Sequence, residues 1–105
     1  MTPNELATAC AASMWDDDNA SQNLGMTIDR VAPGEAVMSM VVTDAMVNGH
    51  GTCHGGYIFT LADSAFAFAC NTYNQNTVGQ QAAITYIAPA FAGEKLVADA
   101  REVSR

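Results

Sequence analysis

A glycine-rich loop runs directly into a long apolar segment at residues 48–71, NGHGTCHGGYIFTLADSAFAFACN. From Gly56 to Asn71 the apolar residues recur at the spacing of an α-helix, so we predict a helix there. Alanine and phenylalanine cover nearly every side of it. We therefore expect this helix to be buried on most sides rather than laid on a surface.

Gly55 and Gly56 stand where the predicted helix begins. The first turn of a helix has backbone N–H groups without intrahelical partners, and it carries a partial positive charge. Glycine lets a ligand approach this backbone closely, and such N–H groups can stabilise a developing oxyanion. Two glycines are also common at a plain loop-to-helix junction, so this signal is weak when taken alone.

Asp63 lies inside the apolar segment, where aspartate is a poor helix former and an unpaired buried carboxylate is costly. One interpretation is that a backbone N–H or a nearby hydroxyl, such as that of Thr60 or Ser64, satisfies the carboxylate. The other is that Asp63 serves as a general base or nucleophile, because an apolar setting raises the basicity of a carboxylate. The residues alone leave both interpretations open.

The offset between Gly55 and Asp63 favours a site made by two chains. Asp63 follows Gly55 by eight residues, which along one helix is a rise of about 12 Å. An oxyanion donor and a base must both lie within about 3 Å of the reacting atoms. Two copies related by a two-fold axis can satisfy this requirement, with Gly55 of one chain facing Asp63 of the other. We therefore predict a site shared across a dimer interface.

His50, Cys53 and His54 form a second cluster of reactive residue types. A zinc site would need a clear fourth ligand or an open position, and the other two cysteines are remote in sequence, so we expect no metal. A Cys–His nucleophilic pair is conceivable, but Cys53 and His54 are adjacent and need not face each other. We expect Cys53 and Cys70 to be small apolar fillers.

The rest of the chain predicts an α+β protein. Thr2, Pro3 and Glu5 have the pattern of a helix start with a capping box. A weak apolar stripe follows and ends at an acidic turn, and four extended segments follow the pattern of strands. The stripe is Leu6, Ala9, Cys10 and Met14, the turn is 16–19, and the strand segments are 26–32, 35–42, 78–88 and 95–103.

Composition limits the class of protein. The 105 residues are enough for one domain, 1–105, and a formal charge of −7 with four Lys+Arg makes nucleic acid an unexpected partner. No stretch reaches the roughly 18 apolar residues of a membrane span, and the N-terminus lacks a signal-peptide pattern. The three cysteines do not have the spacing of a disulfide framework. We expect a cytoplasmic protein.

The segment 48–71 closely resembles hot-dog acyl-CoA thioesterases, above all the PaaI type of phenylacetate degradation, because His-Gly-Gly, the helix and the acid fall at the offsets of that family. The run 84–96 resembles the central strand and following turn of the same family. The resemblance implies a long helix wrapped by a curved antiparallel sheet. It also implies a homodimer with two shared active sites, commonly paired into a tetramer, an acyl-CoA substrate such as an arylacetyl-CoA, and no cofactor.

The resemblance also implies roles for individual residues. Gly55 would polarise the thioester carbonyl through its N–H, and Asp63 of the partner subunit would activate water or attack directly. Asn48 would help to place the acyl group or the water, and His54 would orient the site or donate a hydrogen bond near the thioester. The expected substrate-binding residues are Gly56, Phe66 and Ala67.

Two other functions and one departure from the family pattern stay open. A dehydratase or hydratase of the same fold would use a His with a carboxylate, and a non-catalytic acyl-CoA-binding module would not need Asp63. The chain stops at Arg105 inside a strand pattern, where hot-dog domains usually continue with further strands. We therefore expect missing C-terminal strands and an open sheet edge at the last strand.

Overall fold

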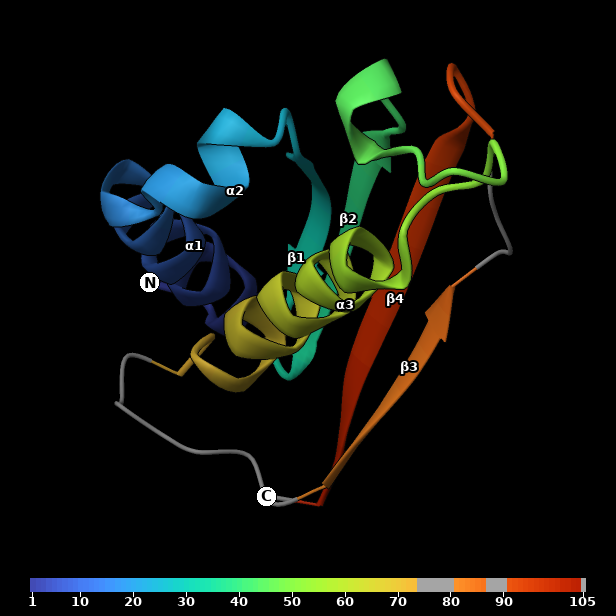
Figure 1. Ribbon diagram of the computed structural model, residues 1–105. Coiled ribbons are helices and arrows are strands. Elements are labelled where there is room, and N and C mark those ends of the chain that lie inside the picture. Colours follow the sequence, from blue (N-terminus) through green and yellow to red (C-terminus); the bar gives the residue numbers. More distant parts are fainter. Residues whose placement is uncertain (74–80, 87–90, 105) are drawn as a thin grey trace.

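A computed structural model describes residues 1–73, 81–86 and 91–104, with 81–86 and 103–104 described through their backbone alone. The chain forms helices along one side of an antiparallel sheet (Figure 1). In chain order the elements are α1 (Pro3–Asp17), α2 (Asn19–Asn23), β1 (Thr27–Ala32), β2 (Glu35–Val41), the 3-10 turn η1 (Asp44–Met46), α3 (Gly55–Cys70), β3 (Gln81–Tyr86) and β4 (Lys95–Ser104).

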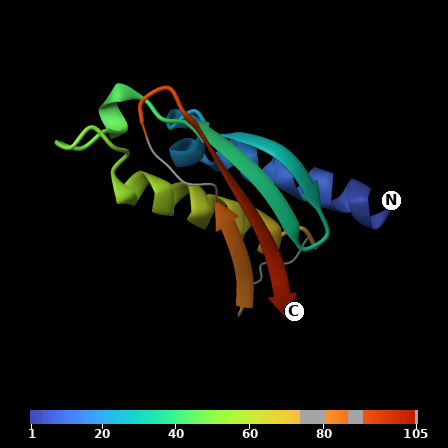
Figure 2. The same cartoon turned by 90° about the vertical axis from the view of Figure 1, so that its right-hand side faces the viewer.

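The sheet has four strands in the order β1-β2-β4-β3, all antiparallel. The last strand of the chain, β4, therefore lies inside the described sheet, between β2 and β3, and the prediction that it forms an open edge is wrong. Sequence cannot reveal this, because strand pairing is set by contacts between distant segments. Figure 2 shows the long strands curving past α3.

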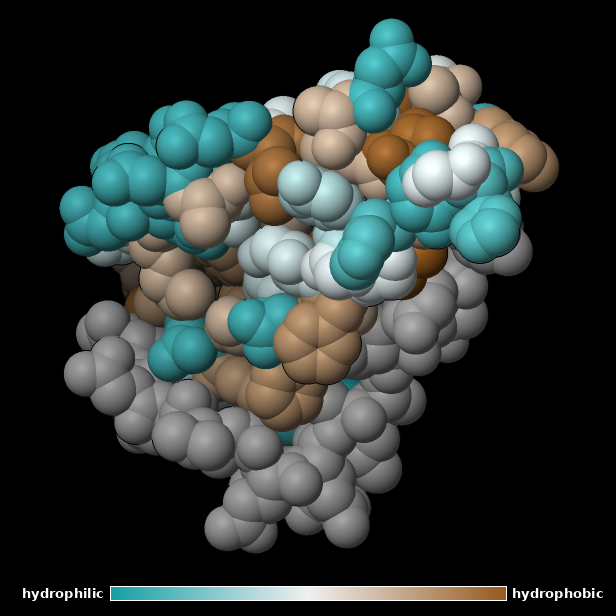
Figure 3. All heavy atoms as spheres, in the orientation of Figure 1, coloured by the Kyte–Doolittle hydropathy of each residue, from teal (hydrophilic) through white to brown (hydrophobic). Residues whose placement is uncertain are grey.

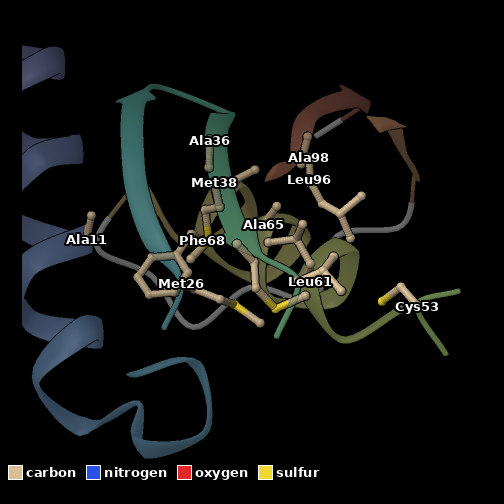
Figure 4. Packing of buried hydrophobic residues seen from close by; sticks show 14 of the residues in the cluster. Ala11, Met26, Ala36, Met38, Cys53, Leu61, Ala65, Phe68, Leu96 and Ala98 are labelled. Atoms are coloured by element: carbon tan, nitrogen blue, oxygen red, sulfur yellow. The ribbon is translucent and has the colours of Figure 1, made fainter. Parts of the chain in front are cut away.

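Helix α3 lies against β2 and β4 because small residues line the middle of the sheet. Ala36 pairs with Ala100 and Met38 pairs with Ala98 across these two strands, and all four are fully buried. Alanine lets the helix approach the strands closely, and the methionines fill the remaining irregular space. Figure 4 shows the side chains that α3 contributes to this layer; they include Leu61, Ala65 and Phe68.

The C-terminal end of α3 is attached to the β1–β2 turn through Thr72. This side chain is 1% exposed; its hydroxyl donates to the Ala69 carbonyl at 3.1 Å and accepts from the Gly34 N–H at 2.7 Å. Gly34 has a φ of +72°, and a Cβ added there would lie 2.8 Å from the Tyr73 hydroxyl. Glycine is therefore required at this position. The β1–β2 turn then fixes the C-terminal end of α3 through Thr72.

The predicted helix start at Thr2 is confirmed, with both hydrogen bonds of the capping box present between Thr2 and Glu5. Its predicted stripe is right in part, because Leu6, Cys10 and Met14 are half-buried whereas Ala9 is exposed. The buried residues of α1 are Ala7 and Ala11, on the helix that packs beside β1 (Figure 1).

The acidic turn ends α1 as predicted, but it also begins a helix that the sequence did not predict. Asp18 caps α2 by accepting from the Ser21 N–H at 3.0 Å. Its other oxygen accepts from the Ser21 hydroxyl at 2.7 Å, and Ser21 in turn is hydrogen-bonded to Ser64 of α3 at 2.8 Å. Since the Ser21 hydrogen is directed to Asp18, Ser64 must be the donor in that second bond. This chain of contacts holds the N-terminal helices against α3.

The four predicted strands are confirmed as β1, β2, β3 and β4, with bounds within three residues wherever the structure describes them. Residues 78–80 and 87–88 of the third predicted segment lie outside the described residues, as do residues 89–90 of the turn that follows it. Within the described ranges, no helix is both long enough and apolar enough to cross a membrane.

We predict that Thr72→Val destabilises the protein by about 1–3 kcal/mol, because it leaves the buried Gly34 N–H without an acceptor. Urea unfolding followed by circular dichroism measures this as a lower transition midpoint with an unchanged slope. Thr72→Ser is the matched control, since it keeps the hydroxyl and loses only a methyl group. Equal midpoints for Thr72→Val and the wild type would show that this hydrogen bond does not hold the end of α3.

Candidate active site

His54 caps the N-terminal end of α3. Its backbone is extended, with φ −62° and ψ 133°, and its Nδ1 accepts a hydrogen bond from the Gly56 N–H at 3.0 Å. Its own N–H donates to the Met46 carbonyl at 2.7 Å, and its ring stands edge-on to Tyr57 with 6.4 Å between ring centroids. Because Nδ1 is the acceptor, the neutral ring carries its proton on Nε2. The residue therefore orients the helix start through its acceptor atom and keeps one outward donor.

The Gly55 N–H is the free donor at this helix start. The other two N–H groups of the first turn are engaged by His54, which accepts from Gly56 through Nδ1 and from Tyr57 through its carbonyl. No acceptor for the Gly55 N–H is found among the described residues, and a Cβ built on Gly55 meets nothing within 4 Å. A ligand oxygen can therefore reach this N–H from solvent, at the positive end of the helix dipole.

Asp63 is exposed on the outer face of α3. The interpretation in which a neighbouring hydroxyl satisfies it is wrong, because Thr60 donates to the Gly56 carbonyl at 2.8 Å and Ser64 is bonded to Ser21. In the part of the chain that the structure describes, the Asp63 carboxylate has neither a hydrogen-bond nor an ion-pair partner. It is available to act on a ligand, but the single chain does not supply the apolar setting that the sequence suggested.

The prediction of a helix buried on most sides is confirmed apart from one narrow outer face, because the exposed residues of α3 are Gly55, Gly56, Phe59 and Asp63 alone. Phe59 is 70% exposed, Phe66 and Ala67 are half-buried, and the fully buried residues all belong to the side that faces the sheet. Figure 3 views the molecule from this side and shows tan apolar spheres beside teal hydrophilic ones. The sheet covers one side of α3, and Trp15 and Ser21 of the N-terminal helices contact Phe68 and Ser64. The described residues place nothing over the remaining face.

Sequence reasoning did not select Phe59, although a signal for it exists. Phe59 lies one turn after Gly55 and one turn before Asp63, so it shares their face of the helix. A large exposed aromatic side chain therefore lies between an unpaired donor and an unpaired carboxylate, which makes this face a candidate binding surface.

Asn48 organises the loop that leads into α3. Its Oδ1 accepts from the His50 N–H at 2.9 Å and from both the N–H and the hydroxyl of Thr52 at 3.3 Å. Its backbone N–H donates to the Thr52 carbonyl at 2.8 Å. The side-chain oxygen is thus engaged inside the loop, which leaves the NH₂ group of Asn48 as the end that can donate to a ligand.

The expected substrate-binding residues lie in two places along α3, with Gly56 at its start and Phe66 and Ala67 further along. The Gly56 N–H is engaged by His54, and a Cβ at Gly56 would lie 3.2 Å from that ring nitrogen, so glycine is needed there for packing. Phe66 and Ala67 lie on the outer side of α3 beyond Asp63.

Cys53 is a buried filler, as predicted, with 6% of its surface exposed. Its thiol contacts the His54 carbonyl at 3.6 Å, and burial raises the pKa of the Cys53 thiol. A thiol with a raised pKa is a poor nucleophile at neutral pH, which argues against a Cys–His pair. Cys70 is also buried. Across the described ranges there is no cluster of three or more residues able to hold a metal ion.

Comparisons with known proteins agree with this arrangement. Residues 50–105 match the family model described as the thioesterase superfamily. The chain is 43% identical over 91 residues to acyl-coenzyme A thioesterase PaaI of Escherichia coli, which is 87% of this chain and 65% of that protein. It is 36% identical over 74 residues to human acyl-coenzyme A thioesterase 13, which is 69% of this chain and 53% of that one.

Solved structures show the same fold. The PaaI protein of the E. coli phenylacetic acid degradation operon superposes with a TM-score of 0.86 at 40% identity, covering 95% of this chain and 72% of that chain. A variant of the phenylacetic acid degradation protein PaaI from Thermus thermophilus superposes with a TM-score of 0.69 at 40% identity, covering 81% and 73%.

The chain matches roughly half to two thirds of the length of these curated relatives, from 53% of the human protein to 65% of the E. coli protein. The family model covers α3, β3 and β4. On this basis the chain belongs to the thioesterase superfamily and has its hot-dog fold.

Proposed function

We propose that this chain forms an acyl-CoA thioesterase, which hydrolyses acyl-CoA to a free acid and coenzyme A. The observation that carries the proposal is the unpaired Gly55 N–H at the start of α3, with the unpaired carboxylate of Asp63 eight residues further along the same exposed face. Membership of the thioesterase superfamily supports the reaction class, and the name of the E. coli relative supports coenzyme A as the thiol.

The proposed reaction uses one donor and one carboxylate from different chains. The Gly55 N–H donates to the thioester carbonyl oxygen, and Asp63 of the partner subunit accepts a proton from water as the water oxygen attacks the carbonyl carbon. The resulting oxyanion is stabilised by the N–H and the helix dipole. When the oxyanion collapses, the C–S bond breaks and the leaving thiolate of coenzyme A takes the proton from the Asp63 carboxyl group.

Asp63 could instead attack the carbonyl carbon directly, forming a mixed anhydride that water then hydrolyses. A single turnover in ¹⁸O-labelled water tests for the direct route, because attack of water on the Asp63 carbon of the anhydride places the label in Asp63. Label in the product acid alone arises from activated water or from attack of water on the acyl carbon of the anhydride, and trapping of the anhydride with hydroxylamine separates these two.

The remaining site residues support this chemistry. His54 fixes the direction of the Gly55 N–H through its cap, and the NH₂ group of Asn48 supplies a further donor for the acyl oxygen or the water. Phe66 and Ala67 contact the acyl group, and Gly56 leaves room for the His54 ring.

We propose an aryl substrate, phenylacetyl-CoA or a hydroxylated derivative, and a place in phenylacetate catabolism. Support comes from the operon of the E. coli protein and from aromatic residues on the outer face of α3. The protein is expected to act in the cytoplasm as a dimer or as two paired dimers.

A thiol-release assay over phenylacetyl-, benzoyl-, medium-chain and β-hydroxyacyl-CoA tests the function. It is run on this chain and on a chain extended past Arg105 to the length of its relatives. Thiol release identifies a thioesterase. Conversion of the β-hydroxyacyl substrate without thiol release would indicate a dehydratase, and binding without turnover would indicate a binding module.

We predict that Asp63→Asn lowers kcat by about 10²–10⁴-fold, the usual contribution of a general base, while KM changes little. The amide keeps the size of the side chain but cannot accept the proton. Steady-state kinetics with the best acyl-CoA of the panel measures both constants. A variant with the kcat of the wild type would remove Asp63 from the mechanism.

Gly55→Pro deletes the free N–H and leaves the helix intact, because proline is favoured at the first helical position and the extended backbone of His54 suits a following proline. We predict a loss of about 10²–10³-fold in kcat, as for other single oxyanion donors. Gly55→Ala keeps the N–H and serves as the control for folding, since its Cβ has open space. If Gly55→Pro folds and turns over as fast as Gly55→Ala, the N–H is not the oxyanion donor.

Mixing the inactive variants Gly55→Pro and Asp63→Asn tests whether sites are shared. A mixed dimer has one site with both changes and one site with neither. After complete exchange of an equal mixture, we predict about a quarter of the wild-type activity. Differently tagged subunits and mass spectrometry verify that exchange has occurred. Mixed dimers without activity would rule out a site shared in this way.

A further inference from the structure

Phe59 is the one exposed large hydrophobic residue of α3. It lies midway between Gly55 and Asp63, four residues from each, and it is 70% exposed although it belongs to the helix at the centre of the fold. Neither its exposure nor its position is explained by the catalytic roles of the other two residues.

A two-fold axis restricts how two copies of α3 can pair. If the helices were parallel to the axis, each residue would face its own counterpart, and Gly55 could not reach Asp63 of the partner subunit. If they are antiparallel and the axis is perpendicular to them, Gly55 faces Asp63 of the partner subunit and Asp63 faces Gly55 of the partner subunit. The residue midway between the two must then lie at the level of the axis, and this residue is Phe59.

The charges on the same face favour the antiparallel arrangement. The start of α3 carries a free N–H at Gly55 and the positive end of the helix dipole. The carboxylate of Asp63 is the one charged group that the outer face of α3 carries within the described residues. Antiparallel helices place each carboxylate opposite the positive end of the neighbouring helix, at both ends of the contact.

We propose that Phe59 packs against Phe59 of the partner subunit on the two-fold axis and sets the distance between the two shared sites. The inference rests on the proposed function, because the pairing of Gly55 with Asp63 defines where the axis passes. The occupant of this face is a second copy of the chain, and the aromatic contact covers the exposed ring of each copy. Each site then lies about 6 Å along the helix from the axis, which is four residues of helical rise.

A cysteine can be cross-linked to the same cysteine of the partner subunit only if both lie near the two-fold axis. The test is therefore Phe59→Cys. Helices in contact lie about 8–10 Å apart, and a disulfide joins Cα atoms about 4.4–6.8 Å apart. We therefore expect a disulfide-linked or short-bismaleimide-linked dimer after mild oxidation or treatment with the reagent. Phe91→Cys is the matched control, because Phe91 is 59% exposed and precedes β4, outside α3.

The wild type, which has Cys53 and Cys70 buried and Cys10 half-buried, gives the background. Cross-linking of Phe59→Cys well above both Phe91→Cys and the wild type supports the placement. A folded dimer of Phe59→Cys that reacts with neither reagent overturns it.

Phe59→Lys gives a second measurement that does not depend on thiol chemistry. Two like charges on the axis should convert the dimer to a monomer in analytical ultracentrifugation, while Phe91→Lys stays dimeric. A Phe59→Lys dimer as stable as the wild type overturns the proposal. Acyl-CoA hydrolysis by the wild type is assayed in parallel: cross-linking without hydrolysis would reject the proposed function and keep the pairing, whereas hydrolysis without cross-linking would reject the pairing alone.

Discussion

Helix α3 packs on the sheet and against the N-terminal helices but keeps one exposed face, and the proposed site follows from that constraint. Alanine residues on β2 and β4 let the helix lie close to the sheet, and Leu61, Ala65 and Phe68 fill the space between them. Thr72 attaches its C-terminal end to the β1–β2 turn and His54 caps its N-terminal end. A helix fixed at both ends holds Gly55 and Asp63 at a constant separation and leaves them on the side that the sheet does not cover.

The fixed distance between Gly55 and Asp63 means that the proposed reaction needs a second chain. Two groups about 12 Å apart along one rigid helix cannot act on the same carbonyl, and the helix cannot bend to bring them together. The exposed face between them is apolar at Phe59 and carries an unpaired carboxylate. A second copy of the chain would cover the apolar surface, place a carboxylate beside each helix start and exclude water from the thioester, which strengthens every electrostatic contact there.

Local features of the fold could be predicted from the sequence. The capping box at Thr2 and the strand segments depend on spacing between near neighbours, and these predictions are confirmed. The order of the strands and the placement of β4 inside the sheet could not be predicted, because they depend on pairing between segments far apart. Helix α2 was missed because an acidic run that ends one helix can also cap the next one.

In the candidate site, too, some features could be predicted from the sequence and others could not. Gly55, Asp63 and Asn48 were selected from their spacing and from family resemblance. The burial expected for Asp63 was wrong, because a helix rich in alanine and phenylalanine does not reveal which side its sheet covers. The hydrogen bond from the Gly56 N–H to the His54 ring could not be read from the sequence either.

The central claim is that a single chain has no complete site. The most direct measurement is the specific activity of the wild type over protein concentrations that span its dimer dissociation constant, with the dimer fraction measured by analytical ultracentrifugation at the same concentrations. If the site is shared between two chains, specific activity follows the dimer fraction and vanishes as the monomer takes over. Undiminished specific activity in a solution of folded monomers would contradict it.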